Sequence, residues 1–158
     1  RALAGLFADV DVRDAFGGRT ALQVAADSGR SEVARLLLDL GADPAAKTSE
    51  GATAQQIAAR RGHHEVERLL FERGADDQHR NLFFRTALHE AAAEGHLEVA
   101  RLLLDLGADP AAKDQHGLTA QVLAARRGHH EVERLLFERG ADDQHRNLFF
   151  RTALHEAA

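Results

Sequence analysis

Apolar residues recur along this chain at spacings of three and four, which is the period of one face of an α-helix. In one stretch the apolar stripe consists of Val99, Leu102, Leu103 and Leu106, and Gly107 follows it as a helix C-cap. The pattern predicts a short amphipathic helix whose apolar face is turned toward a core.

A shorter apolar stripe, made of Leu88, Ala91 and Ala92, precedes this helix. Thr86 stands just before the stripe, where a threonine hydroxyl can cap the first turn of a helix. Gly95 follows the stripe and breaks it. The chain is therefore expected to form two consecutive helices that are joined by a tight turn.

This helix pair recurs with a period of 33 residues, because Thr20, Thr53, Thr86, Thr119 and Thr152 open similar phrases at that spacing. A single helix pair cannot bury its own apolar face, so the pairs are expected to stack into one array. We expect one domain over residues 1–158. It consists of a partial repeat at 1–19, full repeats at 20–52, 53–85, 86–118 and 119–151, and a partial repeat at 152–158.

A longer period lies on top of the first. Residues 58–92 are identical to residues 124–158, and residues 32–47 are identical to residues 98–113. The repeating module is thus a pair of repeats. Such identity indicates either a very recent duplication or an array assembled deliberately from a two-repeat module, and we favour the second interpretation.

Several phrases that recur in phase resemble the ankyrin repeat: the Thr-Ala-Leu-His start at Thr86–His89, an Ala-Ala pair, a Gly-His turn, a Val-x-x-Leu-Leu helix and a Gly-Ala-Asp exit. The resemblance covers nearly the whole chain. It implies an all-α solenoid of stacked antiparallel helix pairs with projecting hairpin-like loops. It also implies a non-catalytic protein-binding scaffold that holds its partner on the loop tips and the concave helix face.

Two features depart from that pattern. The loops have glycine at Gly18, Gly51 and Gly117, but phenylalanine at the equivalent Phe84 and Phe150. Because a bulky residue at positive φ costs about 1–3 kcal/mol, the phenylalanine loops are expected to take another shape.

The second departure lies on the first helices. Gln55 and Gln121 replace the leucine of the other repeats, and an amide at a buried position needs hydrogen-bond partners.

The phenylalanine loops are the strongest candidates for partner binding. Aromatic rings beside arginine on a projecting loop suit an interface, since rigid rings bury a large area at little entropic cost. The alternative interpretation is that the rings fold back over the core of a neighbouring repeat. The candidate residues are His79, Arg80, Asn81, Phe83 and Phe84, with the copies His145, Arg146, Asn147, Phe149 and Phe150.

The histidines suggest structure more than chemistry. His63, His64 and Glu65 resemble a metal-ligand cluster, but His63 occupies the Gly-His turn, so no metal site is expected. The ankyrin resemblance implies that His89 and His155 hydrogen-bond the backbone of neighbouring loops. Without cysteine, and with no serine in a nucleophile elbow, the sequence predicts neither catalysis nor a cofactor.

Both chain ends fall within predicted helices, which raises an alternative function. Leu3 and Leu6 belong to an incomplete second helix, whereas Leu154 and Ala157 belong to an incomplete first helix. These parts are roughly complementary, so head-to-tail stacking would cover both. A structural protein that self-assembles end to end is therefore the second interpretation.

Composition narrows the partners further. A formal net charge of -5 argues against nucleic acid, because phosphate binding needs clustered cations. No apolar run approaches the length of a membrane span, and Arg1–Gly5 lacks the zones of a signal peptide. We therefore expect a soluble protein with a protein partner, cytoplasmic if the chain is natural.

Overall fold

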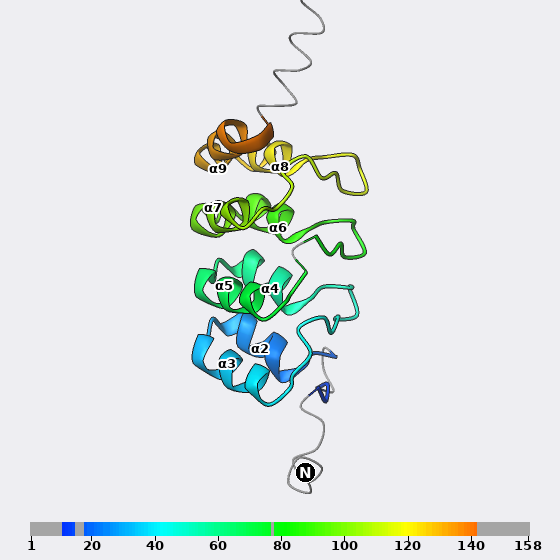
Figure 1. The fold of residues 1–158 in the computed structure, drawn as a ribbon. Helices are drawn as coiled ribbons and strands as arrows, with labels where there is room; N and C mark the ends of the chain where they lie inside the picture. The colour runs from blue at the N-terminus through cyan, green and yellow to red at the C-terminus, as the bar shows by residue number, and fades with distance from the viewer. Residues whose placement is uncertain (1–10, 15–17, 77, 142–158) are drawn as a thin grey trace, which may run out of the picture.

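The computed structural model describes residues 11–14, 18–76 and 78–141 of the chain. Within these ranges it has eight α-helices, one π-helical segment and no strand. The helix pairs stack in chain order, and the long loops all project from the same side of the stack (Figure 1). The helices are α2 (Ala21–Ser28), α3 (Ser31–Asp39), α4 (Ala54–Arg61), α5 (His64–Glu72), α6 (Ala87–Glu94), α7 (Leu97–Asp105), α8 (Ala120–Arg126) and α9 (His130–Leu136), followed by η1 (Phe137–Ala141).

Each first helix of a pair begins at a threonine cap, as the sequence predicts. The threonine hydroxyl accepts a hydrogen bond from the backbone N–H three residues on. In three of the four pairs the side chain at that third position also accepts a bond from the threonine N–H, which completes a capping box. The third-position residues are Gln23, Gln56, His89 and, without the return bond, Val122.

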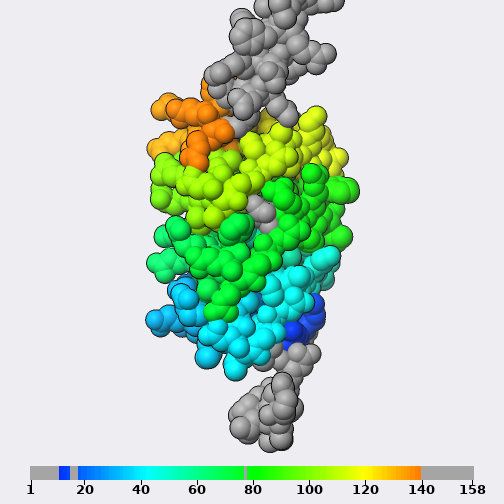
Figure 2. Space-filling model, in the orientation of Figure 1, coloured from blue at the N-terminus to red at the C-terminus, as the bar shows by residue number. Residues whose placement is uncertain are grey.

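The core is built from small residues on the first helices and larger ones on the second. Alanine pairs on α2, α4 and α6 are buried, which lets neighbouring first helices pack closely. Val99, Leu102 and Leu103 of the predicted stripe are also buried on α7, whereas Leu106 follows the helix as its C-cap and is half-buried. The colour bands of Figure 2 follow one another without mixing, so each repeat packs mainly on its neighbours along the chain.

The histidine of each Gly-His turn ties its repeat to the one before it. The Nε2 atoms of His63, His96 and His129 lie 3.0, 2.7 and 3.1 Å from the carbonyl oxygens of Asp27, Arg60 and Ala93. Each imidazole also covers the glycine that ends the preceding first helix. At Gly62 a Cβ atom would lie 2.6 Å from the Nδ1 atom of His96. Only glycine fits there, because the space is filled and φ is +80°.

The buried amide of Gln55 finds a partner for its nitrogen, while its Oε1 accepts no hydrogen bond. Its Nε2 donates to the Oε1 atom of Glu67 at 2.6 Å, and the two residues are 1% and 0% exposed. The bond joins α4 to α5. In the copy, Gln121 is half-buried, and Glu133 instead lies 3.5 Å from the Nδ1 atom of His130.

Ion pairs between repeats alternate in direction. Asp27 and Asp39 of the first repeat meet Arg61 and Arg73 of the second at 2.8 and 2.6 Å. Between the second and third repeats the order is reversed, because Arg60 of the second repeat meets Glu90 of the third at 3.4 Å. The third and fourth repeats are joined as the first two are, by Arg127–Glu94 and Arg139–Asp105. In all five pairs the acid belongs to an odd-numbered repeat and the arginine to an even-numbered one. The exposed pairs among them each stabilise the stack only weakly.

We expect Gly62→Ala to destabilise the array by about 2–3 kcal/mol. A Cβ at positive φ costs about 1–2 kcal/mol. Displacement of His96 also breaks its bond to Arg60, which adds about 1 kcal/mol. Urea denaturation followed by circular dichroism measures the change.

Gly74→Ala is the matched control for this substitution. Gly74 has φ +92°, but a Cβ there would meet nothing within 4 Å. It should therefore show the backbone cost alone. Equal losses for the two variants would mean that the imidazole contact contributes nothing.

Candidate functional site

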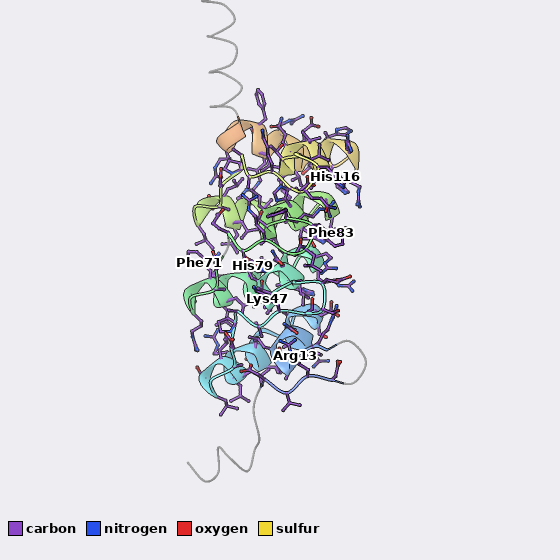
Figure 3. All side chains as sticks on the ribbon, turned by 90° about the vertical axis from the view of Figure 1, so that its right-hand side faces the viewer. Arg13, Lys47, Phe71, His79, Phe83 and His116 are labelled. Atoms are coloured by element: carbon purple, nitrogen blue, oxygen red, sulfur yellow. The ribbon has the colours of Figure 1, made fainter. Side chains whose placement is uncertain are left out.

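The five predicted residues of the phenylalanine loop divide into two groups. His79 and Asn81 hold the loop in place: the Nε2 atom of His79 lies 2.8 Å from the carbonyl oxygen of Gly51, and Asn81 is buried. Arg80, Phe83 and Phe84 are exposed. Figure 3 looks onto the loop side of the stack and shows where His79 and Phe83 lie on that side.

The aromatic rings project from the loop and do not cover the core. Leu82, Phe83 and Phe84 are 68%, 46% and 56% exposed. The guanidinium carbon of Arg80 lies 6.0 Å from the centre of the Phe84 ring, within the range of a cation–π contact. The interpretation that the rings fold back over a neighbouring repeat is therefore wrong for Phe83 and Phe84.

The expectation that the phenylalanine loop takes another shape is also wrong. Phe84 has φ 58°, and its N–H donates to the carbonyl oxygen of Asn81 at 2.9 Å. Gly51 and Gly117 close their own turns with the same bond at the same distance, to Thr48 and Asp114. The loop thus keeps the glycine geometry with a phenylalanine in it.

The side chain of Asn81 stabilises the turn in which Phe84 has a positive φ. Its Oδ1 accepts from the N–H groups of Phe83 and Arg85 at 2.8 and 3.1 Å. Asp114 makes the same pair of bonds in the next loop. These bonds fix the turn from inside and offset the cost of about 1–3 kcal/mol for a non-glycine residue in the left-handed region.

Neighbouring loops are linked through their backbones, so the phenylalanine tip is part of a larger surface. The N–H of Leu82 donates to the carbonyl oxygen of Glu50 at 3.1 Å, and the N–H of Gln115 donates to that of Phe83 at 3.0 Å. A shallow depression of about 280 Å³ lies between the phenylalanine loop and the next loop along the chain, at residues 114–116. It is lined by Phe83, Arg85, Asp114, Gln115 and His116.

Charged side chains support this surface from below. The Nη1 atom of Arg85 lies 3.3 Å from Oε1 of Glu90, and its Nε atom lies 3.9 Å from Oδ2 of Asp114. The carboxylate of Asp114 is almost fully buried. Burial alone would raise the pKa of Asp114, but the N–H groups of Leu118 and His116, with the charge of the nearby Arg85, outweigh it and lower the pKa. Asp114 is therefore held as a carboxylate.

His89 lies beneath the loops and joins two of them. The N–H of Thr86 donates to its Nδ1 at 3.0 Å, and its Nε2 lies 3.1 Å from the carbonyl oxygen of Leu118 in the next loop. Burial lowers the pKa of His89, although its bond to Leu118 and the charge of Asp114 oppose that shift. A proton on Nδ1 would also compete with the Thr86 N–H, so the neutral ring suits this position.

Several predicted residues lie outside the described part of the chain. They are His145, Arg146, Asn147, Phe149, Phe150, His155, Leu3, Leu6, Leu154 and Ala157.

No group of metal-ligating side chains is present among the described residues, and His63 is engaged with the carbonyl oxygen of Asp27. Of the helices that the structure describes, none is long and apolar enough to cross a membrane.

The link that the turn histidines make between repeats was not predicted from the sequence. The Gly-His pattern indicates a turn at His63 but does not by itself name a partner for the imidazole. The signal was available, because histidine stands at 63, 96 and 129, always one residue after a glycine and always one repeat apart. A strict spacing of glycine and imidazole indicates a contact between repeats more than a ligand site.

Comparison with known families agrees with the stacked helix pairs. A family model described as Ankyrin repeats (3 copies) matches residues 40–114 and 88–158, and a model described as Ankyrin repeat matches residues 17–49. No curated protein matches the chain.

The lowered pKa of His89 predicts a pH-dependent stability. Between the ordinary histidine pKa of about 6.5 and the lower pKa in the fold, the unfolded chain binds more protons. The free energy of unfolding should therefore fall as the pH drops from about 7.5 to about 5. Chemical denaturation at a series of pH values measures this.

The variant His89→Gln isolates the contribution of this imidazole. Gln23 and Gln56 occupy the equivalent position and make the same bonds, both to the capping threonine and to a loop carbonyl oxygen. We expect the variant to fold and to lose less stability than the parent over the same pH range. An unchanged pH dependence would place the effect on other groups.

Proposed function

Because the chain belongs to the ankyrin-repeat family, whose members are generally scaffolds for protein interaction, we propose that it is a non-catalytic scaffold that holds a protein partner against its loop tips. The repeats supply a rigid stack, and the loops supply the contact surface. Fold alone does not fix function, so the proposal depends on this particular surface.

The exposed phenylalanine tip is the observation that supports the proposal. Three consecutive large apolar residues, Leu82, Phe83 and Phe84, are each about half exposed or more. Single exposed apolar residues are ordinary on protein surfaces, but a contiguous cluster on a projecting loop is typical of an interaction site. The neighbouring Arg80 adds the residue type that most often accompanies aromatic rings at hot spots.

The first-helix face beside the loops extends the proposed surface. Val24 on α2 and Val122 on α8 are 45% and 38% exposed. Asp27 of α2, Arg61 of α4 and Glu94 of α6 add charge to the first helices, in pairs that span repeats. A partner held by the phenylalanine tip would lie next to this mixed apolar and charged face.

A second candidate function is self-association along the stack. Val33 and Leu36 of α3 are 43% and 58% exposed, whereas the equivalent Val99 and Leu102 of α7 are 0% and 7% exposed because α5 packs against α7. A helix of a second copy could cover α3 as α5 covers α7. The identical modules in the sequence suit such an array, whether duplicated or assembled deliberately.

Selection from a random peptide library displayed on phage tests the first proposal. The immobilised full chain should enrich a family of peptides whose binding is lost, by about tenfold or more, in Phe83→Ser/Phe149→Ser, because truncation of a hot-spot ring costs 2 kcal/mol or more. Both positions are changed because residues 124–158 copy residues 58–92.

Leu40→Ser/Phe137→Ser is the control, since it removes exposed apolar side chains at the ends of the second helices α3 and α9, outside the proposed surface, and leaves the loops intact. Peptides that bind the phenylalanine variant and the parent equally well would show that the tip is not the binding surface. Circular dichroism should confirm that both variants keep the helical fold.

Light scattering over a tenfold or wider concentration range tests self-association. If α3 is covered by a second copy, the mass should grow with concentration, and Leu36→Glu should return the chain to a monomer. Replacement of an exposed leucine by glutamate leaves the fold intact but buries an unpaired charge in the association contact. A constant monomer mass for the parent would overturn the second candidate.

A further inference from the structure

The loops carry one cation per repeat at a single equivalent position. Arg13, Lys47, Arg80 and Lys113 follow one another at 34, 33 and 33 residues, the extra residue falling near Gly17–Gly18. All four are exposed. Lys47 and Lys113 are the only lysines of the chain, so both stand in this column. Figure 3 shows Arg13 and Lys47 at successive levels on the loop side.

Hydrogen bonds between loops hold these four residues, the cation column, in line. Arg13 donates from Nη1 to the carbonyl oxygen of Lys47 at 2.5 Å, and Arg80 donates in the same way to Lys113 at 2.9 Å. Each arginine therefore lies against the backbone of the next member of the column. Its remaining N–H groups, and the lysine ammonium groups, extend the positive charge along the loops.

The cation column forms no salt bridge in the ranges that the structure describes. The ion pairs there involve other arginines and His130. This is notable in a chain whose formal net charge is -5. Arg80 also lies over the ring of Phe84, so the column passes directly beside the exposed phenylalanine tip.

We propose that the cation column binds an acidic protein segment that runs along the stack in an extended conformation, with an apolar side chain of that segment against Phe83 and Phe84. The inference rests on the proposed scaffold function and specifies its partner. Carboxylates complement the column, and the aromatic tip supplies the desolvated anchor that exposed ion pairs lack.

The distance between successive repeats determines how far apart the carboxylates of the bound segment should be. Packed helices lie about 8–10 Å apart, so successive cations should recur at about that distance. An extended chain in the polyproline II conformation advances about 3.1 Å per residue and has three residues per turn, so that every third side chain points to the same side. Carboxylates at every third residue therefore match the column, whereas acids that are clustered in sequence meet only one or two cations.

A synthetic peptide pair tests this match by fluorescence anisotropy. The first labelled peptide has glutamate at every third residue with leucine and phenylalanine between, and the second has the same composition with the glutamates clustered. The spaced peptide should bind the full chain about tenfold more tightly, since it engages about two more ion pairs. Equal affinity for the two peptides would overturn the extended register.

Charge reversal identifies the surface. Lys47→Glu/Lys113→Glu should weaken the spaced peptide about tenfold or more. Arg35→Glu/Arg68→Glu makes the same change in net charge at exposed arginines of α3 and α5 and should weaken it about twofold or less. Equal losses in the two variants would show that overall charge, and not the column, attracts the peptide.

The outcomes separate this inference from the proposed function. If library-selected peptides lose binding in Phe83→Ser/Phe149→Ser but keep it in Lys47→Glu/Lys113→Glu, the scaffold function stands and the acidic partner is wrong. If no selected peptide depends on the phenylalanines, the function itself fails. A single-stranded DNA oligonucleotide that bound through the column more tightly than the spaced peptide would also overturn the inference, in favour of a nucleic-acid partner.

Discussion

The stack depends on the contact between the imidazole of each Gly-His turn and the glycine that ends the first helix of the repeat before it. The glycine reverses the chain at positive φ, and the absence of its Cβ lets the imidazole reach the helix carbonyl oxygen. The same glycine thus ends the first helix and leaves the space in which the imidazole of the next repeat packs. Since a lone helix pair cannot bury its apolar face, this contact also decides whether the core is completed.

Helices and repeats could be predicted from the sequence because their signals are local. Thr86 and Gly95 mark the ends of α6 by short-range hydrogen bonds, and the apolar stripe of α7 has the period of a helix. The turn at Phe84 could not be predicted in this way. Local preference argues against positive φ for phenylalanine, but the Asn81 side chain and the neighbouring loops impose it.

The candidate surface was predicted only in part. Aromatic rings near Arg80 marked the loop correctly, but sequence alone could not decide whether Phe83 and Phe84 projected or folded back. That depends on the backbone bonds that join each loop to its neighbours. Separate bonds from the arginine side chains, Arg13 to Lys47 and Arg80 to Lys113, place each lysine beside an arginine, so charges that are far apart in the sequence lie on neighbouring loops.

The alternating ion pairs bear on how such an array could lengthen or shorten. If the second repeat were lost, Glu94 would stand where Arg61 stands and would meet Asp27, and Leu106 would take the place of Arg73 opposite Asp39. Loss of two repeats restores the acid-to-arginine order. An array shortened by one two-repeat module therefore keeps its ion pairs between repeats, whereas loss of the second repeat alone leaves two carboxylates, Asp27 and Glu94, opposite each other.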